Sequence, residues 1–81
     1  QRAKELADIL GKQKWVKSVL PAETNIVIFE VSDSNMVAEI FLSHGIKVQP
    51  FSLTSVRMVT HLDYNSEMHA KTLAIIPSMK L

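Results

Sequence analysis

The chain has 81 residues, of which 47% are hydrophobic and 21% charged, and its formal net charge is +1. These values fit one small globular domain and exclude a disordered chain or a strongly basic nucleic-acid-binding one. There is no cysteine, and no apolar run approaches the roughly 18 to 20 residues of a membrane span, so we expect a cytoplasmic protein without membrane or nucleic-acid partners.

The first half of the chain predicts one helix and two strands. Apolar residues between positions 3 and 10 fall mainly on one helical face, and Gly11 either weakens the last turn of that helix or marks its exit. The segment "WVKSVL" predicts a short edge strand that stops at Pro21. The continuous β-branched run in "NIVIFEV", residues 25–31, predicts the core strand of the sheet.

Capping residues delimit the elements of the second half. "SDSN", residues 32–35, supplies N-cap chemistry for a second helix, and Gly45 is placed as its left-handed C-terminal residue. "IKVQPF" predicts a strand that ends at Pro50, and "VRMVTH" predicts the next strand. Asn65 can cap a third helix through "SEMHAKTLAII", which Pro77 should stop or kink near its end.

The element order α-β-β-α-β-β-α defines the predicted fold class. It is an α+β two-layer sandwich, in which helices cover a mostly antiparallel sheet, and residues 1–81 form a single domain. Gln1 is not an initiator methionine, and helical periodicity begins at once without a capping residue. We therefore expect this domain to be part of a longer chain.

Arg57 is the residue that interrupts the apolar pattern of the fourth strand. Alternation places Arg57, Val59 and His61 on one face of that strand. A buried guanidinium requires either a carboxylate of its own domain or an anionic ligand. Arginine suits a carboxylate ligand, because its planar fork can donate two parallel hydrogen bonds.

The residues alone leave two interpretations of Arg57 open. In the first, the strand lies at a sheet edge, and Arg57 reaches water or pairs with Glu30, Asp63 or Glu67. In the second, Arg57 is a binding residue for an anionic molecule.

A family resemblance favours the second interpretation. "TNIVIFEV" and a helix, then "HGIKV", a loop and "VRMVTHLD", resemble the C-terminal small domain of the low-specificity L-threonine aldolases. These are fold-type I lyases that depend on pyridoxal phosphate (PLP), and the likeness spans Thr24 to about Thr72. In that family the arginine of the Arg-x-Val-Thr-His-Leu-Asp string binds the α-carboxylate of the amino acid joined to PLP. The resemblance thus implies that Arg57 binds substrate. His61 shares the strand face of Arg57 and is a second candidate, and the alternative is a histidine that packs in the core or anchors a loop.

The same resemblance implies what lies outside this chain. The parent enzyme would cleave threonine or allo-threonine to glycine and acetaldehyde, and it would be a homotetramer. No catalytic residue is expected here, because the chain offers no candidate for the PLP lysine, the glycine-rich phosphate turn or the aspartate of the pyridine nitrogen. These belong to a large domain of the same polypeptide, so residues 1–81 alone would bind no PLP and be inactive.

Two alternatives to an aldolase domain stay open. The chain could be a free-standing α+β module that binds an anion or a partner through Arg57, or the small domain of a related PLP-dependent β-lyase. The remaining histidines predict less: we expect His44 at a helix C-terminus and His69 as a solvated helix residue. No spacing of His, Asp and Glu predicts a metal site.

Overall fold

A computed structural model of the chain describes residues 2–20, 25–60 and 64–79. It contains three helices and a four-stranded antiparallel sheet, which confirms the predicted α+β class and element order. In chain order the elements are α1 (Arg2–Leu10), β1 (Ser18–Val19), β2 (Ile26–Glu30), α2 (Ser34–Ser43), β3 (Gln49–Pro50), β4 (Ser55–Val59), α3 (Ser66–Ile75) and a final 3₁₀ turn, η1 (Ile76–Ser78).

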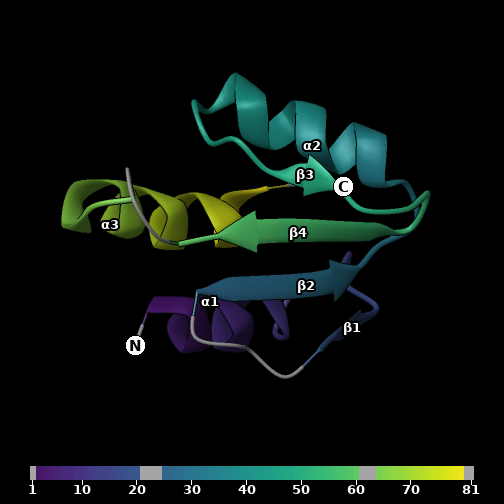
Figure 1. The fold of residues 1–81 in the computed structure, drawn as a ribbon, viewed down its shortest axis with the longest axis horizontal. Coiled ribbons are helices and arrows are strands. Elements are labelled where there is room, and N and C mark those ends of the chain that lie inside the picture. The colour runs from purple at the N-terminus through teal and green to yellow at the C-terminus, as the bar shows by residue number, and fades with distance from the viewer. Residues whose placement is uncertain (1, 21–24, 61–63, 80–81) are drawn as a thin grey trace.

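The two longest strands form the centre of the sheet. The strand order is β1-β2-β4-β3, so β2 and β4 pair with each other and the two-residue strands lie at the edges (Figure 1). In this register Arg57 of β4 lies between Ile28 of β2 and Gln49 of β3. Edge strands this short leave few unpaired backbone groups for another chain to pair with.

One face of the sheet is buried under the helices. Val27, Phe29 and Val56 on this face have no exposed surface, as their alternation along the strands predicts. Phe41 of α2 and Trp15 both meet Phe29 edge to face, with ring centroids 6.4 and 6.3 Å from it. Such pairs contribute about 0.5–1.5 kcal/mol each beyond the burial of area, so this aromatic cluster anchors the helices on the sheet.

The ends of α2 and α3 follow the predicted capping chemistry. The Asp33 side chain accepts a hydrogen bond from the backbone N–H of Met36, and Gly45 has a φ of 80° just beyond α2. Asn65 caps α3 in the same way. The α-helix ends before Pro77, where a 3₁₀ turn replaces it, because proline removes a backbone donor.

The prediction that His69 is a solvated helix residue is wrong. Its side chain is buried between α1 and α3, with Nδ1 2.8 Å from the Tyr64 hydroxyl and Nε2 2.7 Å from a Glu5 carboxylate oxygen. Both contacts are possible because α1 packs against α3, although Glu5 and His69 are far apart in sequence. His69 therefore joins the two helices.

Candidate functional site

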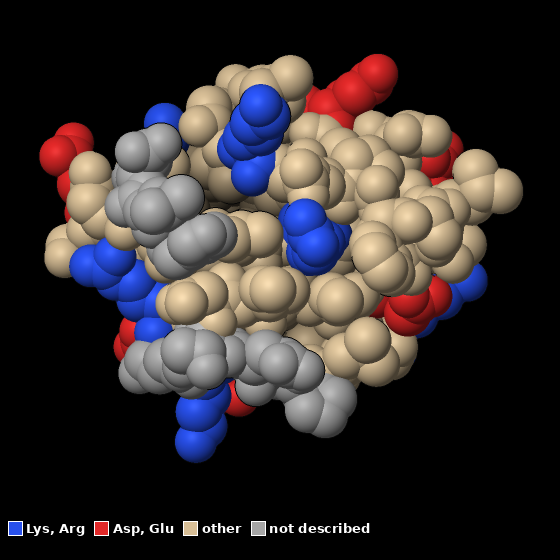
Figure 2. Space-filling model, viewed as in Figure 1, with Lys and Arg blue, Asp and Glu red and all other residues tan. Residues whose placement is uncertain are grey.

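The second face of the sheet is the surface on which Arg57 lies. Ile26, Ile28 and Glu30 of β2 and Val59 of β4 share this face, and all are partly exposed, since the helices pack on the opposite side. We call this surface the open sheet face. In Figure 2 a cationic side chain lies over β4 on a surface made mostly of uncharged residues, and the acidic side chains in this view are scattered away from it.

The Arg57 guanidinium is held by a neutral neighbour. Its Nη2 donates a hydrogen bond to the Gln49 side-chain oxygen at 2.7 Å, across the β3–β4 pair. Its Nε–H is buried and has no hydrogen-bond partner among the described residues. An unpaired buried donor of this kind costs about 1–3 kcal/mol. The hydrogen-bonding capacity open to a ligand lies in the remaining terminal N–H groups of the guanidinium, since Arg57 is partly exposed and, within the described part of the chain, only Nη2 is bonded, to Gln49.

The described residues do not support the ion-pair interpretation. Glu30 instead accepts hydrogen bonds from the Thr54 hydroxyl, at 3.2 Å, and from the Ser55 hydroxyl. Across residues 2–20, 25–60 and 64–79, no carboxylate lies within 4.0 Å of the guanidinium; this includes Glu67, whereas Asp63 lies outside those ranges. The edge position that this interpretation requires is also not found, because β4 pairs on both sides.

The surroundings of Arg57 favour a carboxylate as its ligand. Ile28 and Val59 are apolar and lie on the same face, so they lower the local dielectric constant around a bound charge and strengthen its attraction to the guanidinium. Gln49 orients the guanidinium without neutralising its charge. A carboxylate can then accept the two parallel hydrogen bonds that the fork donates.

Gln49 is the site residue that the sequence did not predict. Its role depends on the register between β3 and β4, which places it directly opposite Arg57. The neighbouring Pro50 marked only the end of a strand, and no local pattern in "IKVQPF" fixes which residue faces Arg57. His61, the second predicted binding residue, lies outside the described residues.

The open sheet face does not fit PLP itself. The cross-strand neighbours of Arg57 are Ile28 and Gln49, and neither supplies the amine that a Schiff base requires. Within the described residues, no group of three or more His, Asp or Glu side chains could hold a metal ion. The site therefore offers recognition of an anionic group by one arginine and no bond-breaking chemistry of its own.

Comparison with known proteins assigns the chain to no family. It matches no protein-family model, and no curated protein is significantly similar to it. None of the helices in the described part of the chain is long and apolar enough to cross a membrane.

Proposed function

We propose that this domain binds the α-carboxylate of an amino acid substrate, as the small domain of a PLP-dependent threonine aldolase. The observation that carries the proposal is the environment of the Arg57 guanidinium. Arg57 lies on the open sheet face beside Ile28, Val59 and Gln49, with a buried unpaired Nε–H and no described carboxylate within 4.0 Å. The resemblance of "VRMVTHLD" to the aldolase string supports the same role.

In this proposal Arg57 contributes orientation. A carboxylate gripped at two points cannot rotate freely, so the bonds around the neighbouring Cα adopt a fixed direction relative to the rest of the active site. The PLP of the parent enzyme would supply the electron sink for breaking the Cα–Cβ bond of threonine, which yields glycine and acetaldehyde. Arg57 itself transfers no proton.

The open sheet face suggests where the PLP-binding domain lies. Part of the surface around Arg57 is apolar and partly exposed to water, because it consists of Ile26, Ile28 and Val59. A large domain of the same polypeptide, packed against this face, would bury these residues and enclose the carboxylate site between the domains. A cytoplasmic homotetramer is the state that we propose for the complete enzyme.

Adding threonine to the complete PLP-loaded polypeptide that contains this domain tests the function. We expect stoichiometric glycine and acetaldehyde, which coupled reduction of the aldehyde would measure. The matched control is 1-amino-2-propanol, which is threonine without its carboxylate, and it should bind poorly and give no aldehyde. Ammonia and a keto acid in place of acetaldehyde would indicate a β-eliminating lyase, and no turnover with any amino acid would contradict an enzyme domain.

A further inference from the structure

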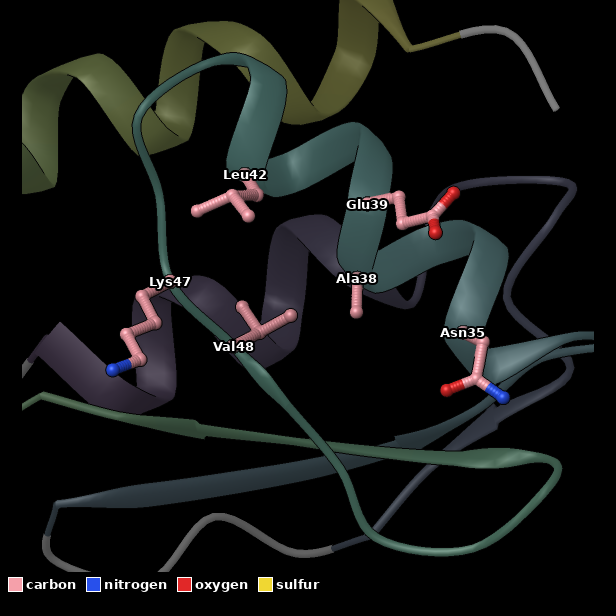
Figure 3. Close-up of a pocket in the computed structure, with 6 residues that line it drawn as sticks. All are labelled: Asn35, Ala38, Glu39, Leu42, Lys47 and Val48. Atoms are coloured by element: carbon pink, nitrogen blue, oxygen red, sulfur yellow. The ribbon is translucent and has the colours of Figure 1, made fainter.

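Helix α2 and the segment leading into β3 line an open pocket of about 290 Å³, and β3 is the edge strand of the sheet opposite β1. We call this pocket the α2 groove. Figure 3 shows the residues that line it, which are Asn35, Ala38, Glu39, Leu42, Lys47 and Val48.

The apolar part of the α2 groove consists of the projecting Leu42 side chain and, beside it, the part of the pocket lined by Ala38 and Val48. Leu42 is 62% exposed, although it lies within a helix that buries Val37 and Phe41 on its other side. Ala38 and Val48 lie next to it in Figure 3, and Val48 is only 9% exposed. A surface that carries both a projecting leucine and an adjacent apolar hollow can receive the same leucine from a second copy.

The charges of the α2 groove are also self-complementary. Figure 3 shows the Lys47 amino group and the Glu39 carboxylate directed away from each other, toward opposite ends of the groove. Both residues are exposed, and within the described residues neither forms a salt bridge. A two-fold axis that passes between them would place each Glu39 against the Lys47 of the other copy, so two ion pairs would form.

We propose that the α2 groove is the contact surface of a symmetric dimer of this chain. Leu42 of each copy would enter the hollow of the other, and two Glu39–Lys47 pairs would fix the register. A patch of six residues is smaller than a stable interface requires, so the dimer is a weak and transient one. The dimer contact involves neither Arg57 nor the open sheet face. It can therefore be confirmed or refuted independently of the proposed function.

Sedimentation of the 81-residue chain, from about 10 µM to about 1 mM, tests the proposal. The chain should shift from monomer to dimer over this range. Leu42→Gln should raise the dissociation constant at least about tenfold, because the projecting group is lost. Leu53→Gln is the matched control: Leu53 is 81% exposed but lies outside the groove, so its replacement should change nothing.

Charge reversal tests the two-fold register. Glu39→Lys and Lys47→Glu should each weaken the dimer about tenfold, because each places two like-charged pairs in contact. An equimolar mixture of these two variants should form a heterodimer about as tight as the original dimer, since every pair is again of opposite sign. Only contacts between molecules can produce this rescue.

Three outcomes would overturn the proposal. The first is a chain that stays monomeric up to the highest concentration. The second is a dimer that Leu42→Gln does not weaken, which would place the contact on another surface. The third is a dimer that Leu42→Gln weakens but in which mixing the charge variants gives no rescue, which would contradict the two-fold register.

Discussion

Replacing Arg57 with methionine should change the free energy of unfolding by between about −0.5 and +2.5 kcal/mol, so that the domain is nearly as stable as before or more stable. Methionine keeps a long apolar side chain beside Ile28 and removes the buried Nε–H, which has no described partner and costs about 1–3 kcal/mol. It also removes the bond from Nη2 to Gln49. That bond is solvent-exposed, so its loss costs about 0.5–1.5 kcal/mol.

The opposite expectation follows if Arg57 is a structural residue. Removing one member of a buried ion pair destabilises a protein by about 3–5 kcal/mol, because the remaining charge is left unpaired. The two interpretations therefore predict different changes in the free energy of unfolding. The difference between them is larger than the error of a denaturation experiment. A residue kept for ligand binding at the expense of stability is common at functional sites.

Urea unfolding followed by the fluorescence of Trp15, the only tryptophan, measures the difference. With a slope of about 1 kcal/mol per molar urea, Arg57→Met should move the midpoint by between about 0.5 M downward and about 2.5 M upward. Arg2→Met is the matched control, because Arg2 donates to the Tyr64 carbonyl at 2.6 Å and to the Ser66 hydroxyl at 2.8 Å. Arg2→Met should lower the urea midpoint. A fall of about 3 kcal/mol in the free energy of unfolding of Arg57→Met would refute the reasoning.

Two further predictions concern the fold. Gly45→Ala should destabilise the domain by about 1–2 kcal/mol in urea unfolding, because φ at Gly45 is 80°; Gly11→Ala, where φ is not positive, is the control and should cost less. Burial raises the pKa of the Tyr64 hydroxyl above its ordinary value, so the unfolded chain loses this proton first, and stability should fall as the pH rises above about 10. Tyr64→Phe should remove that part of the alkaline loss, and tyrosinate absorbance of the single tyrosine measures the titration directly; an unchanged profile in the variant would contradict the assignment.

Local patterns predicted the elements of this fold because their causes are local. The caps at Asp33 and Asn65 and the positive φ of Gly45 depend on residues within one turn of a helix end. Alternation in β4 likewise assigned Arg57 to the face opposite Val56, since successive strand residues point to opposite sides.

The contacts that the sequence did not predict are long-range. His69 occupies the buried face of α3 together with Thr72, and two polar residues on one face conceal the apolar stripe that marks a core-facing helix. Its partner Glu5 lies on α1, which only the packed fold brings close. Gln49 faces Arg57 for the same reason, since strand register is fixed by pairing and not by the residues of one strand.

The most direct test of the proposed role is the effect of Arg57 on substrate binding in the complete PLP-loaded polypeptide. Arg57→Ala should raise the KM for threonine by about a hundredfold or more, since two charge-assisted hydrogen bonds are lost, while the PLP absorbance is retained. Arg57→Lys should recover little of that loss, because a point charge cannot reproduce the two-point grip. An unchanged KM in Arg57→Ala, with PLP bound, would contradict the assignment of Arg57 as the carboxylate-binding residue.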